Sequence, residues 1–96
     1  MEIVKAKVVE IDEKHFIKIE NGDEGIKIPI SEDKPNAVKS AFNKLIARIK
    51  EGEFKIELED VGQDLFSQVA NEYIMQLNRE IQEVRGEMKG YGLVGD

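Results

Sequence analysis

The predicted fold depends most on residues 71–90, NEYIMQLNREIQEVRGEMKG. An apolar residue recurs there at steps of four, three and four, which is the spacing of one helical face. This stripe consists of Leu77, Ile81, Val84 and Met88, and it continues an apolar face that begins near Val61. We therefore predict one helix from Val61 to about Lys89, roughly 43 Å long at the usual rise per residue.

A helix of that length is too long for the sheet that the rest of the chain predicts, because a strand of six residues spans only about 20 Å. We expect the sheet to cover only the first half of the helix, through its apolar residues Leu65, Phe66, Val69, Ala70, Tyr73 and Ile74. Leaving the rest of the stripe exposed would forfeit about 1.5–3 kcal/mol for each side chain.

Two interpretations of the far end of the stripe remain open. In the first, the helix pairs with a second copy, and Leu77, Ile81, Val84 and Met88 form the seam of a homodimer. In the second, the helix bends or the first hairpin reaches further, and the stripe is ordinary core. Gly86 marks a weak point in either case, since glycine costs about 1 kcal/mol inside a helix. We expect the tail from about residue 90 to 96 to be flexible.

Upstream of this helix, the pattern predicts strands at residues 2–11, 15–20 and 26–30, a helix from about Pro35 to Gly52, and a fourth strand in EFKIELE. Pro29 lacks an N–H group, so the third strand is expected at an edge of the sheet. The order β-β-β-α-β-α predicts an α+β two-layer sandwich, with a four-stranded, mainly antiparallel sheet and two helices on one face. The 96 residues are expected to form a single domain.

Local signals refine this picture. Val4, Ala6 and Val8 share one face of the first strand, whereas Val9 and Ile11 take the opposite one. Either a β-bulge or a strand partly covered on both faces explains the change. Asn21-Gly22 is expected to supply the positive φ angles of a tight hairpin, and Asp60 to cap the last helix with Gln63 as its capping-box partner.

Composition excludes several classes of protein. The chain is 41% hydrophobic and 35% charged, with a net charge of −6, no cysteine and one histidine. Disulfides and thiolate zinc sites are thereby excluded, and no apolar run approaches the roughly 20 residues of a membrane span. The N-terminus does not resemble a signal peptide, so a cytoplasmic location is expected.

No motif for catalysis or for a cofactor is found. His15 follows Asp12 and Glu13, but no nucleophile accompanies it, and neither GxxxxGK[ST] nor GxGxxG occurs. We therefore predict a protein that is not an enzyme and has no cofactor. The first functional hypothesis is a non-catalytic protein-interaction module, such as a small regulator or an antitoxin or immunity-type inhibitor, that self-associates through its last helix.

The alternative hypothesis is nucleic-acid binding. The outward face of the predicted sheet combines an aromatic residue with lysines, as in proteins that bind single-stranded nucleic acid. Its members are Lys5, Lys7, Phe16, Lys18, Lys27 and Lys55. Lys44 and Arg48 of the first helix, in a segment without acidic residues, are further candidates. Against this hypothesis, Glu20, Glu57 and Glu59 share the sheet face and are expected to neutralise its lysines through cross-strand pairs.

Overall fold

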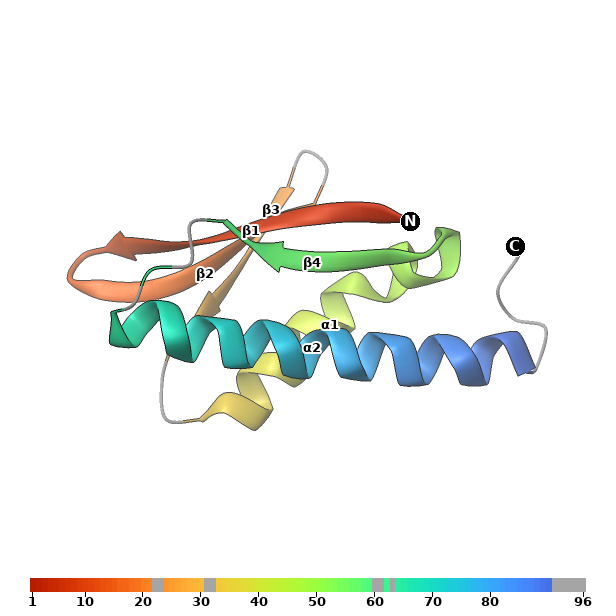
Figure 1. The fold of residues 1–96 in the computed structure, drawn as a ribbon. Coiled ribbons are helices and arrows are strands. Elements are labelled where there is room, and N and C mark those ends of the chain that lie inside the picture. The colour runs from red at the N-terminus through yellow and green to blue at the C-terminus, as the bar shows by residue number, and fades with distance from the viewer. Residues whose placement is uncertain (22–23, 31–32, 60–61, 63, 91–96) are drawn as a thin grey trace.

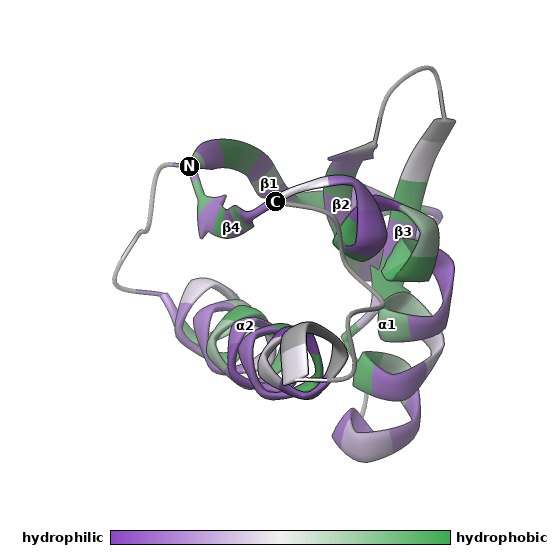
Figure 2. Ribbon diagram, turned by 90° about the vertical axis from the view of Figure 1, so that its right-hand side faces the viewer, coloured by the Kyte–Doolittle hydropathy of each residue, from purple (hydrophilic) through white to green (hydrophobic). Residues whose placement is uncertain are grey.

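The computed structural model describes residues 1–21, 24–30, 33–59, 62 and 64–90. Along the chain the elements are β1 (Glu2–Ile11), β2 (Lys14–Asn21), β3 (Glu24–Pro29), α1 (Lys34–Glu51), β4 (Phe54–Leu58) and α2 (Leu65–Gly90). Both helices lie against the same face of the sheet (Figures 1 and 2). The predicted element order and the α+β two-layer architecture are confirmed.

The four strands form one sheet in the order β3-β2-β1-β4. β1 pairs with β2 and β2 with β3 in antiparallel fashion, but β4 lies parallel to β1 because α1 carries the chain across the sheet. The sheet is therefore mixed, with two antiparallel pairings and one parallel pairing. β3 is an edge strand, as Pro29 predicts.

The β1–β2 hairpin closes through a two-residue turn. Asp12 and Glu13 have φ angles of 51° and 66°, and two successive positive angles are typical of the type I′ turn that matches strand twist. The pairing runs without an extra residue from Ala6↔Ile19 to Ile11↔Lys14, so the possible bulge is not present. Val8 and Val9 are both half-buried, which fits the other interpretation, a strand partly covered on both faces.

Two further local predictions lie wholly or partly outside the described residues. Asn21 pairs with Glu24, so residues 22–23 connect β2 to β3, and Asn21 itself does not have a positive φ angle. Asp60, Gln63 and the tail beyond Gly90 are also outside the described part.

α1 starts and stops as predicted, with a proline in its first turn and Gly52 at its C-cap.

The last helix begins at Leu65, not at Val61. Asp64 caps it, because its carboxylate accepts hydrogen bonds from the backbone N–H of Ser67 at 3.1 Å and from the Ser67 hydroxyl at 2.7 Å. These bonds hold the pKa of Asp64 below its usual value, the hydroxyl contributing most. Leu65 and Phe66 occupy the first turn and are exposed, so their predicted place in the core is wrong.

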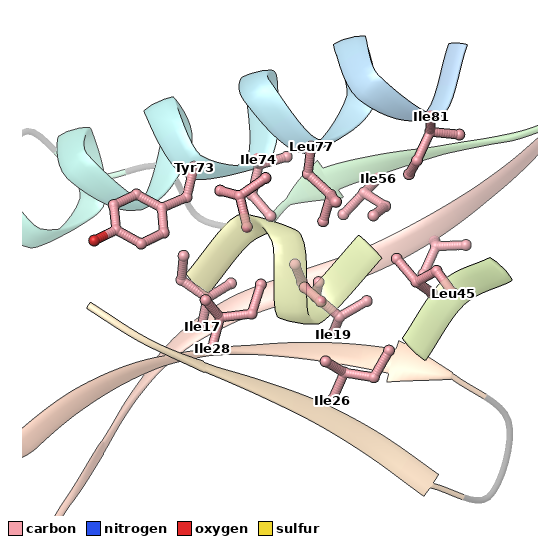
Figure 3. Close-up of a cluster of buried hydrophobic side chains, with 14 of the residues drawn as sticks. Ile17, Ile19, Ile26, Ile28, Leu45, Ile56, Tyr73, Ile74, Leu77 and Ile81 are labelled. Atoms are coloured by element: carbon pink, nitrogen blue, oxygen red, sulfur yellow. The ribbon is translucent and has the colours of Figure 1, made fainter. Parts of the chain in front are cut away.

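The core joins the helix-facing sides of the strands to both helices (Figure 3). Ile17, Ile19, Ile26 and Ile28 of the sheet face Leu45 of α1 and Tyr73, Ile74, Leu77 and Ile81 of α2. Ala70, Tyr73 and Ile74 are buried and Val69 is half-buried, as predicted.

The far end of the α2 stripe is largely intrachain core. Leu77 and Ile81 are 0% and 1% exposed, and Val84 packs half-buried against the same cluster. The side chain of Met88 is outside the described part. α1 crosses beneath the sheet and meets the second half of α2, where the buried Arg85 donates a hydrogen bond to the carbonyl of Ile49 in the last turn of α1. The predicted homodimer seam is therefore wrong for Leu77 and Ile81, because no partner can reach them.

α2 also covers the outer edge of β4. The Asn78 side chain donates to the carbonyl of Ile56 at 2.8 Å and accepts from the Ile56 N–H at 2.9 Å. One turn later, Gln82 donates to the carbonyl of Phe54 at 3.3 Å. This edge of the sheet is thus occupied by side-chain amides. Among the described residues, no helix combines the length and apolar character needed to cross a bilayer.

Candidate nucleic-acid interface

The face of the sheet opposite the helices is open (Figure 2). Residues that pair directly across strands share a face, so the register defines which side chains meet there. The paired residues form successive rows across this face, each two residues further along the strands than the last.

The middle row contains three lysines side by side. Lys7 of β1 pairs with Lys18 of β2, and Lys18 pairs with Lys27 of β3. We call Lys7, Lys18 and Lys27 the lysine row. Opposed residues on neighbouring strands have Cβ atoms about 4.5–5.5 Å apart, and like charges at that distance destabilise a sheet. Within the described part of the chain, none of the three forms an ion pair.

An uncharged row lies next to the lysine row on the side of the β1–β2 turn. Val9 pairs with Phe16 and Phe16 with Pro29. Val9 and Phe16 are half-buried and Pro29 is exposed. We call these three residues the apolar row. Because residues two apart on a strand are separated by nearly 7 Å, a ligand of modest size can touch both rows.

Two acidic residues of the face, Glu20 and Glu57, lie on the other side of the lysine row, whereas Glu59 follows Leu58, the partner of Ala6, and so lies at the Lys7 end of that row. Lys5 pairs with Glu57, Glu20 pairs with Gly25, and Lys55 approaches Glu57 at 3.9 Å along β4. Lys5 and Glu57 are thus one of the expected cross-strand pairs, but within the described residues no ion pair involves Lys7, Lys18 or Lys27. The register separates the face into a charge-mixed end and a basic end.

Lys18, at the centre of the lysine row, has a defined position. Its side chain is half-buried and leans across β3 at Gly25, where a Cβ atom would lie 3.3 Å from the Lys18 Cε. Because Gly25 has no side chain, the Lys18 side chain has room to lie across β3 at this position. The ammonium group, which is bonded to Cε, therefore lies near Gly25.

The two predicted contacts on α1 do not join this surface. Arg48 lies in the helical layer, where it forms an ion pair with Glu2 and its guanidinium carbon lies 5.4 Å from the centre of the Phe54 ring. Lys44 lies beside β3 on the helical side. Lys5 and Lys55 share the open face but occupy its charge-mixed end. Of the predicted residues, the structure thus brings together Lys7, Phe16, Lys18 and Lys27.

Sequence analysis missed Lys14, Val9 and Pro29. Lys14 pairs with Ile11 one row beyond the apolar row, and it adds a further cation to the basic end. The predicted second strand begins only at residue 15, and Lys14 shares the parity of Phe16 and Lys18 once the turn is limited to two residues.

His15 lies on the face of the sheet that the helices cover, and its contacts there are structural. Its ring stacks on Phe66, with centroids 3.6 Å apart and an interplanar angle of 6°. Its Nε2 lies 3.7 Å from a carboxylate oxygen of Glu10. No group of histidine and acidic residues suited to hold a metal ion occurs in the described ranges. This arrangement fixes the start of α2 against the hairpin.

Comparisons with protein-family models, curated proteins and solved structures find no match to this chain.

Proposed function

We propose that the protein binds single-stranded nucleic acid on the open face of its sheet. The observation that carries this proposal is the lysine row, in which three like charges are aligned on neighbouring strands without ion pairs among the described residues. Such an alignment lowers the stability of the free fold, and a polyanion would relieve it.

The adjacent apolar row supplies the second element of the interface. A strand that crosses the sheet can set phosphates against Lys7, Lys18 and Lys27 while a base stacks on Phe16. Stacking tolerates any base, so the surface favours binding without strong sequence preference. The net charge of −6 opposes long-range attraction, and we expect modest affinity with the contacts confined to this end of the sheet.

Fluorescence anisotropy with labelled oligonucleotides of mixed sequence tests the proposal. Single strands should bind more tightly than duplexes of the same length. With three phosphates neutralised, the logarithm of the association constant should fall with the logarithm of salt concentration with a slope of about −2. Absence of binding at low salt to any single strand would contradict the proposal.

Two variants and one control locate the interface. Lys18→Glu should abolish most of the affinity, and Phe16→Val should weaken binding about tenfold through lost stacking while leaving the salt slope unchanged. Lys39→Glu makes the same change of charge on the exposed surface of α1 and should bind nearly as the wild type does. Equal losses for Lys18→Glu and Lys39→Glu would mean that only the total charge matters.

A further inference from the structure

The two edges of the sheet differ in how they are protected. The outer edge of β4 is occupied by Asn78 and Gln82, as described above. β3 forms the other edge, and no described residue hydrogen-bonds the outer side of its backbone. Exposed edges are sites of strand addition, and β3 carries Lys27 and Pro29, residue types that discourage pairing with an unmatched strand.

The hydrogen-bond pattern between β2 and β3 determines which backbone N–H and carbonyl groups of β3 point away from the sheet. The Ile30 N–H donates to the carbonyl of His15 at 3.0 Å, so Ile30 belongs to a hydrogen-bonded pair. Pairing type alternates along an antiparallel ladder, so Ile28 and Ile26 also point their backbone groups toward β2. Gly25, Lys27 and Pro29 therefore direct theirs away from the sheet. Lys27, at the centre, offers both an N–H and a carbonyl.

A groove runs between this edge and α1. Its volume is about 250 Å³, and it is lined by Lys27 and Pro29 on the strand side and by Asn36, Ser40 and Lys44 on the helix side. We call it the edge groove. Its volume is below the 300–1,000 Å³ typical of small-molecule pockets. A strand and a helix that flank an open groove instead resemble the setting in which an extended peptide adds to a sheet.

The charges of the edge groove select the kind of peptide. Two cations flank the groove, Lys44 on the helix side and Lys27 at the strand edge with its side chain on the open face. Its acidic residue, Asp33, already accepts a hydrogen bond from the Asn36 side chain at 2.7 Å. The groove thus has a basic excess that suits acidic side chains. A second copy fits poorly, because two β3 strands paired about Lys27 would place these lysines opposite each other.

We propose that the edge groove binds an extended acidic peptide segment, which adds to β3 as a fifth strand. The peptide backbone pairs with the N–H and carbonyl of Lys27 and with Gly25. Side chains of one parity enter the groove beside Ser40, and carboxylates of the other parity lie beside Lys27 on the open face. Lys27 belongs to both proposed surfaces, whereas Lys7 and Lys18 belong only to the lysine row and Ser40 and Lys44 only to the edge groove.

The probe is a short peptide in which valine and glutamate alternate, followed by NMR of the isotopically labelled protein. Added peptide should shift the amide signals of Gly25 and Lys27 and slow their exchange with solvent. A peptide in which lysine replaces glutamate should bind at least about tenfold more weakly. Unchanged signals from Gly25 and Lys27 at millimolar peptide would overturn the proposal.

A matched pair of variants separates backbone pairing from charge. Lys27→Ala removes the charge and keeps the N–H, whereas Lys27→Pro removes both without breaking a β2–β3 hydrogen bond. Loss of a backbone hydrogen bond should make Lys27→Pro bind about tenfold more weakly than Lys27→Ala. Equal affinities would contradict strand addition.

The same test can be made on the wild-type protein if Lys27→Pro does not fold. Two peptides are compared, one methylated on the backbone nitrogens of its odd residues and one on those of its even residues. Only the peptide whose methyl groups replace the N–H groups that face β3 should lose binding. Lys7→Glu, two strands from the edge, should leave peptide binding unchanged while it weakens oligonucleotide binding. The two proposals can thus fail separately, and equal binding by both methylated peptides would refute the present one.

Discussion

Asn78 of α2 pairs with the backbone of Ile56 in β4 as a neighbouring strand would. Its amide makes one hydrogen bond to the Ile56 carbonyl and accepts one from the Ile56 N–H, at 2.8 and 2.9 Å. The side chain of a helix thus satisfies both polar groups that β4 turns outward at this residue. The long helix protects a sheet edge as well as covering the core.

Removing this amide should destabilise the fold and expose the edge. We expect Asn78→Ala to lower the free energy of unfolding in urea by about 1–3 kcal/mol, because the Ile56 N–H and carbonyl lose their partners in a partly buried place. The variant should also aggregate more readily. Arg79→Ala, at the exposed neighbouring position, is the control and should change stability by less than about 0.5 kcal/mol. Equal effects of the two substitutions would contradict the role of Asn78.

The stripe of α2 should behave as core. Ile81→Ala should cost about 2–5 kcal/mol, as for other buried isoleucines. Met75→Ala changes a residue of the same helix that is 56% exposed and should have little effect. Ile81→Glu should unfold the chain. If sedimentation showed a dimeric wild type and a folded, monomeric Ile81→Glu variant, the result would instead support the homodimer seam.

Replacing the central lysine of the lysine row should raise stability while it reduces binding. Lys18→Glu converts two like-charged cross-strand pairs into two opposite pairs, each worth about 0.2–1 kcal/mol. The free energy of unfolding should increase at low salt, and the increase should shrink as salt screens the charges. Lys39→Glu, on α1, should show no such increase. A loss of stability in Lys18→Glu would mean that the lysine row supports the fold.

The Asp64 cap should give a pH-dependent contribution to stability. Because hydrogen bonds from Ser67 lower the pKa of Asp64 in the folded state, the ionised form favours folding. The contribution is complete above the usual value of 3.8 and is lost as pH falls through the lower folded pKa. Asparagine also caps helices but does not titrate, so Asp64→Asn isolates the charge. The difference in melting temperature between wild type and Asp64→Asn should narrow between about pH 5 and about pH 2. A constant difference would contradict this assignment.

The sequence by itself determined the elements and their inward faces. In the sequence, Phe54 and Ile56 alternate with charged residues and Val38, Ala41, Leu45 and Ile49 recur at helical spacing, and all six are buried. Pro29 placed β3 at an edge, and Gly52 ended α1. These features depend on residues that are neighbours along the chain, which is why they can be read without coordinates.

Only the tertiary structure decided which residues lie opposite each other across the strands and between the helices. Parity put lysines and glutamates on one face, but the register of β1, β2 and β3 aligned Lys7, Lys18 and Lys27 away from Glu20 and Glu57. In the same way, the stripe of α2 predicted that something must cover it, and the path of α1 showed that the chain covers most of it itself. A one-residue change of register, or a different crossing of the helices, would rearrange these contacts while leaving each local pattern unchanged.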